Sequence, residues 1–166
     1  MNKYVFIAVV FCAFACERGT EEECLADPIV TEADLSSGAT YDSLYAEKLG
    51  ADEYGMHEYV IAFLKVGPNR DQPEEEQKEL QRAHLDNIGR MADDGSLVLA
   101  GPFSKEGDLK GIYIFDVKTI EEAQELTRTD PAIEAGRLVM ELHPWYGTAA
   151  LMEVSEIHRR IAKIKI

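Results

Sequence analysis

The chain has 166 residues, 46% of them hydrophobic, and a formal net charge of −14 from 31 acidic and 17 basic residues. Its length fits one domain with appended segments, and its apolar content is enough for a sizeable core. The acidic excess argues against nucleic acid as a partner, because phosphate binding needs a basic patch.

Residues 1–15 have the pattern of an export signal. Lys3 precedes an apolar run that ends at Ala15 and is shorter than the roughly 20 residues that span a bilayer. The small residues Ala13 and Ala15 precede Cys16, which resembles a bacterial lipoprotein signal. We therefore expect lipid on Cys16 and a membrane-anchored protein of the cell envelope, at the outer membrane or the cell surface. An ordinary cleaved signal and an uncleaved anchor are the alternatives.

Residues 16–40 are predicted to form an acidic, disordered tether. The stretch from Glu17 to Thr40 carries seven acidic residues, one arginine and no aromatic residue. An acidic cluster in this place resembles the surface-export signal of some lipoproteins, and it is equally compatible with a solvated stalk. Cys24 would be left as a free thiol or an intermolecular cross-link, so we expect no internal disulfide.

The globular part begins with residues 41–57, a short lead-in helix ended by Gly50 and then a linker. The segment 58–66, rich in β-branched and aromatic residues, predicts the first strand. A long helix follows, with Pro73 in its first turn and Gly95 after its end. Its apolar spacing includes His84, which is therefore expected on or beside the face that packs against a sheet.

The remaining pattern completes the order β-α-β-β-α-β over residues 58–152. The predicted elements are strands at 97–100 and 111–117, a helix capped by Thr119, a helical turn after Asp130, and a strand from Arg137. This order predicts a ferredoxin-like α+β fold, an antiparallel sheet with two helices on one face. The other sheet face would expose apolar residues, so we expect a homodimer.

Three motifs within this domain carry a family resemblance. "RAHLDNI" contains His84, "LVLAGPF" contains Gly101 and Pro102, and "TDPAIEAG" contains Asp130. In this order they resemble the YciI-like, or YCII-related, domain. The resemblance implies a ferredoxin-like dimeric α/β barrel and an active site built on His84 and Asp130. It also implies general acid/base chemistry such as dehydrohalogenation, which some relatives are thought to perform.

Both proposed site residues also have a structural interpretation. His84 could be a core histidine whose ring nitrogens are bonded to neighbours. Asp130 precedes Pro131, and aspartate in that place is a common helix N-cap. As a site, a neutral imidazole would accept or donate a proton, and a carboxylate would fix its tautomer. Capping and orienting compete for the same oxygens, although one oxygen could serve each role.

Further residues are candidates for substrate binding. Asn69 and Arg70 follow the first strand, and arginine suits an anionic group. Ser104 lies in the loop after the second strand, and Trp145 and Tyr146 could wall an apolar pocket or contribute to a dimer contact. Each could instead be a solvated or packing residue.

We expect no metal and no cofactor. His84 and His143 have no metal-ligand spacing, the domain has no cysteine, and no phosphate loop, dinucleotide fingerprint or serine nucleophile motif occurs.

The C-terminal segment 153–166 is locally basic and amphipathic. Ile157, Ile161 and Ile164 share one helical face. It could lie on an anionic membrane, but we favour docking on the acidic body of the protein or on a dimer partner.

Two functions from different classes follow. The first is an exported enzyme that uses His84 and Asp130 for general acid/base chemistry, lyase-like or dehydrohalogenase-like, on a small organic molecule, with aromatic and halogenated compounds as candidates. The second is a non-catalytic envelope binding or assembly module that uses the same dimer cleft. A hydrogen bond between His84 and Asp130 beside an open cleft would favour the enzyme.

Overall fold

The computed structural model describes residues 40–164. The predicted signal peptide, the predicted lipidation site Cys16, Cys24 and nearly all of the predicted acidic tether lie outside the described residues. Between residues 40 and 164, no helix combines the length and the apolar character needed to cross a membrane.

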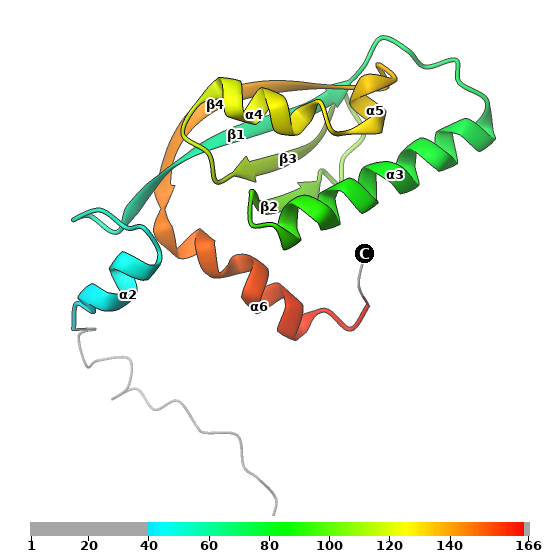
Figure 1. The fold of residues 1–166 in the computed structure, drawn as a ribbon. Coiled ribbons are helices and arrows are strands. Elements are labelled where there is room, and N and C mark those ends of the chain that lie inside the picture. The colour runs from blue at the N-terminus through cyan, green and yellow to red at the C-terminus, as the bar shows by residue number, and fades with distance from the viewer. Residues whose placement is uncertain (1–39, 165–166) are drawn as a thin grey trace, which may run out of the picture. The chain divides into compact units, whose positions relative to one another are not determined.

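Six helices and four strands follow one another in the described part of the chain (Figure 1). They are α2 (Ser43–Lys48), β1 (Met56–Val66), α3 (Glu74–Asp93), β2 (Leu97–Pro102), β3 (Leu109–Phe115), α4 (Ile120–Thr127), α5 (Pro131–Glu134), β4 (Leu138–Thr148), the 3-10 helix η1 (Ala149–Glu153) and α6 (Val154–Ile161). The predicted α+β class and β-α-β-β-α-β order are confirmed.

The four strands form one antiparallel sheet in the order β2-β3-β1-β4. β1 begins at Met56, two residues earlier than predicted, because Met56 pairs with Thr148 at the far end of β4. β3 is shifted toward the N-terminus of its predicted range, since Leu109 already pairs with Lys65. Strand pairing across the sheet therefore sets these limits, and local residue preference does not.

One face of the sheet carries the main core, and both long helices pack there. Val60, Ala62 and Leu64 of β1 are buried with Met91 of α3 and Ala123 of α4. Alternate residues of a strand point to the same face, so the even-numbered positions of β1 face the helices. The predicted placement of two helices on one face is therefore correct.

The opposite face is partly covered, which corrects the expectation of a bare face. Tyr59, Val98 and Ile114 are buried there, with Leu151 and Met152 of η1 packed against them. Val139 of β4 remains 40% exposed. The homodimer stays a prediction.

His57 fastens the lead-in segment to the sheet. Its Nδ1 lies 2.9 Å from the Gly50 carbonyl oxygen and its Nε2 lies 2.8 Å from an Asp116 carboxylate oxygen. Burial lowers the pKa of His57, but the hydrogen bonds to Gly50 and Asp116 together raise that pKa above its ordinary value. Two acceptors facing the two ring nitrogens fit an imidazolium, which donates from both.

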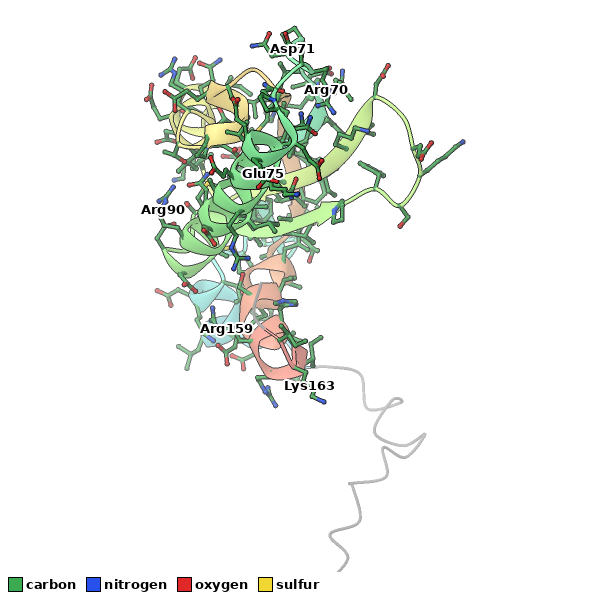
Figure 2. The ribbon with its side chains drawn as sticks, turned by 90° about the vertical axis from the view of Figure 1, so that its right-hand side faces the viewer. Arg70, Asp71, Glu75, Arg90, Arg159 and Lys163 are labelled. Carbon is green, nitrogen blue, oxygen red and sulfur yellow. The ribbon has the colours of Figure 1, made fainter. Side chains whose placement is uncertain are left out.

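The predicted basic tail contains α6. Its side of the molecule carries Arg159 and Lys163, far from the loop that carries Arg70 (Figure 2). Ser155 contacts the Val98 carbonyl oxygen at 3.5 Å, whereas Ile157 and Ile161 are 50% and 74% exposed. The helix thus begins against the sheet but presents apolar side chains outward, and its predicted docking partner stays a prediction.

Candidate functional site

His84 lies on the sheet-facing side of α3. Glu74, Glu75 and Glu76 occupy the first turn of this helix, where carboxylates favour the positive end of the helix dipole. His84 is buried, with 8% of its surface exposed, and its Nδ1 lies 2.6 Å from Oδ2 of Asp130. The two residues are 46 positions apart in the chain. The fold therefore brings together the two residues that the sequence singled out.

Asp130 performs both of the roles that were expected to compete. It is the N-cap of α5, where its Oδ1 accepts a hydrogen bond from the Ala132 backbone N–H at 2.9 Å. Its Oδ2 is the oxygen that faces His84. Asp130 has no exposed surface, so both oxygens take their hydrogen bonds from the protein. Pro131 at the first helical position sets the turn that aims this carboxylate.

The carboxylate determines which ring nitrogen of His84 carries the proton. Because a carboxylate only accepts hydrogen bonds, Nδ1 is the donor, and Nε2 of the neutral ring keeps its lone pair. The Tyr113 hydroxyl lies 3.3 Å from Nε2, and the two rings are nearly parallel with centroids 6.2 Å apart. The hydroxyl can donate to Nε2, which makes a chain from Tyr113 through His84 to Asp130.

Tyr113 is a site residue that the sequence reasoning missed. It lies on β3 and is 2% exposed. Burial raises the pKa of the Tyr113 hydroxyl well above its ordinary value, and the charge of Asp130 raises it further, so the residue is a neutral phenol. The sequence feature that could have identified it is the alternation of the "GIYIFDV" segment. This alternation places the Tyr113 hydroxyl at a core-facing position, on the side of the sheet where α3 carries His84.

A cavity of about 370 Å³ adjoins these residues. It is bordered by the end of β1, the start of β4 and the middle of α3. Its lining residues are Leu64, Arg70, Gln81, His84, Leu85, Ile88, Ala100, Gly101, Pro102, Lys110, Gly111, Tyr113, Ala132, Arg137 and Leu138. His84 and Tyr113 therefore both border a space large enough for a small molecule.

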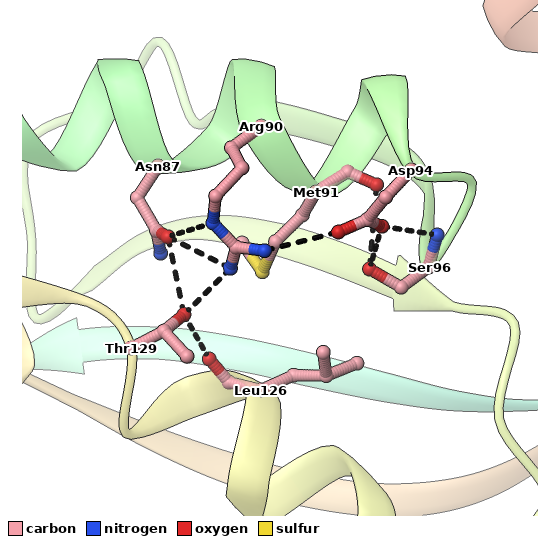
Figure 3. Close-up of polar contacts among 7 residues, drawn as sticks. All are labelled: Asn87, Arg90, Met91, Asp94, Ser96, Leu126 and Thr129. Carbon is pink, nitrogen blue, oxygen red and sulfur yellow. Dashed lines mark hydrogen bonds and ion pairs between the residues drawn. The ribbon is translucent and has the colours of Figure 1, made fainter.

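A polar network holds the residue before Asp130 against α3 (Figure 3). Arg90 donates from Nη2 to the Thr129 hydroxyl at 3.0 Å and from Nε to Oδ1 of Asn87 at 3.2 Å. The Thr129 hydroxyl donates to the Leu126 carbonyl oxygen at 2.7 Å. Asn87 lies about one helical turn after His84, so the network joins the residue before Asp130 to the same helix that carries the imidazole.

The predicted substrate-binding residues separate into two groups. Arg70 lines the cavity, and Asn69 beside it donates from its side chain to the Ala135 carbonyl oxygen at 3.0 Å, which fixes the loop after β1. Ser104, Trp145 and Tyr146 do not line this cavity.

The sheet register explains the position of the two aromatic residues. Leu138 borders the cavity and pairs with Val66, whereas Trp145 pairs with Tyr59. These positions are seven residues apart on β4, which corresponds to roughly 23 Å along a strand. Trp145 packs against the Tyr59 ring with centroids 5.7 Å apart, and the Tyr146 hydroxyl donates to Asp52.

Among residues 40–164, no group of three histidine, cysteine, aspartate or glutamate residues is arranged to hold a metal ion.

Comparisons with known proteins identify the family of the domain that carries this site. The family model of the YCII-related domain matches residues 61–146, which include His84, Tyr113 and Asp130. The comparison with curated proteins finds no matching relative.

A solved structure with similarity to this chain is 5-chloro-2-hydroxyhydroquinone dehydrochlorinase from Burkholderia phenoliruptrix, in complex with 2,5-dihydroxybenzoquinone. It is 17% identical over 52% of this chain and 92% of that chain, with a TM-score of 0.39.

Proposed function

This chain belongs to the YCII-related domain family, and we propose that it is a small-molecule enzyme in which His84 and Asp130 perform general acid/base chemistry. The observation that carries the proposal is the 2.6 Å contact between Nδ1 of His84 and the buried Asp130 carboxylate, beside a cavity that His84 lines. A binding module needs no such arrangement, because an imidazole held by a carboxylate with its unprotonated nitrogen beside a cavity is arranged for proton transfer.

In the proposed reaction, Nε2 of His84 takes a proton from an acidic C–H group of the substrate. Asp130 keeps the ring in the Nδ1–H form and stabilises the imidazolium that results. The Tyr113 hydroxyl, released from Nε2, donates to an oxygen of the substrate. In a dehydrohalogenation, the C–H electron pair forms the new double bond and halide leaves from the neighbouring carbon.

Proton exchange tests this function without knowledge of the natural substrate. We expect the full chain to catalyse exchange of C–H hydrogens for deuterium in some members of a panel of small ketones, phenols and their chlorinated derivatives in D₂O. The His84→Asn variant is expected to lose about 10²- to 10⁴-fold of that rate, the range for removal of a general base. NMR of the substrate signals measures the rates.

The matched control is His143→Asn, which removes an exposed histidine of β4 that pairs with Glu141. It should exchange protons at the wild-type rate. If no compound in the panel exchanges, or if His84→Asn is as active as wild type, the acid/base proposal fails and the binding module becomes the better hypothesis.

For localisation, we propose that the enzyme is exported and held at the membrane by lipid on Cys16. The support is the sequence pattern of residues 1–16 alone. We expect the mature protein in the membrane fraction of a bacterial cell to begin at an acylated Cys16, which mass spectrometry of its N-terminal peptide would detect. An unmodified Cys16 in that peptide would contradict the anchor.

A further inference from the structure

We propose that the cavity beside His84 binds a small organic carboxylate, whose charged group is held by Arg70 and Arg137 and whose apolar body extends toward His84. This inference rests on the proposed function for its biological meaning, but its evidence is the charge and lining of the cavity.

The charge of the cavity is opposite to that of the protein. Arg70, Lys110 and Arg137 line it, and its lining residues include no aspartate or glutamate. The whole chain, in contrast, has 31 acidic and 17 basic residues. A concave site lined by one sign of charge concentrates ligands of the other sign.

Among residues 40–164, no carboxylate forms an ion pair with either arginine. Arg70 donates from Nη1 to the backbone carbonyl oxygen of Arg137 at 3.1 Å. Arg137 donates to the side-chain oxygens of Gln72 at 3.2 Å and Gln77 at 2.9 Å. These acceptors are uncharged, so they orient the two guanidinium groups and leave their charges unpaired.

Four of the five other arginines between residues 40 and 164 behave differently, and the exception is Arg160 of α6, which lies outside the cavity. Arg82, Arg90, Arg128 and Arg159 each form an ion pair with an acidic residue on their own helix or at its end, whereas residues 40–164 contain no such pair for Arg70 or Arg137. The carboxylate of the site, Asp130, is fully buried and uses its oxygens for His84 and Ala132. An anionic ligand is therefore the missing partner of these two arginines.

Arg70 and Arg137 line the same cavity as His84, so one ligand could contact both the guanidinium groups and the imidazole. Arg70 extends from the loop after β1, at one end of the molecule (Figure 2), and Arg137 immediately precedes β4. The register places Val66 beside Leu138, so the end of β1 and the start of β4 are neighbours. Guanidinium groups bind carboxylates through paired hydrogen bonds, which would fix the ligand in one orientation.

The other lining residues indicate the chemical character of the part of the ligand that is not charged. Leu64, Leu85, Ile88 and Leu138 contribute apolar side chains. At about 370 Å³, the cavity is at the small end of the roughly 300–1,000 Å³ range of ligand sites. The expected ligand is thus a compact apolar body, such as one ring, with a carboxylate at one end.

Benzoate and benzamide test this proposal, because they share a shape and differ in charge. Using NMR titration of the full chain at pH 8, we expect saturable binding of benzoate and at least tenfold weaker binding of benzamide. The Arg70→Gln variant should weaken benzoate binding by about tenfold, as expected for loss of one charge-assisted hydrogen bond, and leave benzamide unchanged. Arg70 is exposed, so this variant should fold.

The matched control is Arg82→Gln, which removes the same charge from α3 at a position outside the cavity. It should bind benzoate as wild type does. Equal affinity for the two compounds, no binding of either, or no effect of Arg70→Gln would each overturn the proposal.

A parallel titration of His84→Asn separates this inference from the proposed function. Preference for benzoate that survives in this variant supports the anion site whatever the outcome of the proton-exchange assay. Loss of the preference there, with Arg70 intact, would mean that the arginines do not supply the charge recognition, and it would overturn the proposal.

Discussion

The Asp130→Ala variant is expected to lose about 3 kcal/mol of the free energy of unfolding. Loss of an N-cap costs about 1 kcal/mol, and a buried donor left without an acceptor costs about 1–3 kcal/mol. Here the substitution removes the acceptor of the Ala132 N–H and of the buried Nδ1–H of His84 together. Chemical denaturation of the full chain, followed by circular dichroism, would measure the difference.

Asp42 supplies a matched control for the capping contribution. It is the N-cap of α2, where its side chain accepts a hydrogen bond from the Tyr45 N–H at 3.0 Å, but it is exposed. The Asp42→Ala variant should lose no more than about 1 kcal/mol. If both substitutions cost the same, the buried contact with His84 adds nothing to stability, and the argument for a coupled pair is wrong.

The imidazole tautomer gives an independent measurement of the same pair. Nitrogen-15 NMR of the neutral His84 ring is expected to show the proton on Nδ1 in the wild type and in Tyr113→Phe. In Asp130→Ala, at a denaturant-free condition where the chain is folded, the proton should move substantially to Nε2. A purely structural cap would leave the tautomer unchanged.

The Gly67→Ala variant is expected to be destabilised by about 3 kcal/mol, the upper part of the range for overpacking. A Cβ atom at Gly67 would lie 2.2 Å from the backbone oxygen of Gly136 and 2.7 Å from the carbonyl carbon of Arg137. These are backbone atoms, and they cannot rotate away as a flexible side chain can. The start of β4 would have to move from the end of β1, where the Gly67 N–H now donates to the Arg137 carbonyl oxygen at 2.9 Å.

Gly89 is the control with the opposite expected sign. It lies inside α3, and a Cβ atom there would have no neighbour within 4 Å. Alanine at this position should stabilise the protein by about 0.5–1 kcal/mol, because glycine inside a helix loses more backbone entropy on folding. Denaturation curves measure the change in the free energy of unfolding for both variants. If the two changes have the same sign, the close backbone contact at Gly67 does not explain its cost, and this prediction is wrong.

Much of the fold could be predicted from local features of the sequence. Thr119 caps its helix as expected and forms a capping box with Glu122. Pro73 is the N-cap of the long helix, one position before the first turn where the sequence predicts it, and Gly95 follows the C-cap residue Asp94. The spacing that placed His84 on the sheet-facing side was also correct, because helical period depends only on neighbouring residues. The YCII-related resemblance, carried by three short motifs, is likewise confirmed by the family match over residues 61–146.

The limits of the strands depended on partners distant in the chain. Met56 and Leu109 join the sheet because Thr148 and Lys65 face them across it, although neither residue extends the local strand pattern. The covering of the second sheet face by Leu151 and Met152 has the same origin, since these residues pack against Tyr59, which is distant from them in the chain.

The amino-acid sequence by itself determined the fold class and the element order, and its resemblance to the YCII-related domain pointed to His84 and Asp130 as a candidate site. Tertiary structure alone decided that Asp130 divides its oxygens between Ala132 and His84, that Tyr113 faces Nε2, and that Trp145 lies away from the cavity. The physical reason is range: caps and helical faces arise within a few residues, whereas a site assembled from α3, β3 and α5 exists only when strand register and helix packing bring those segments together.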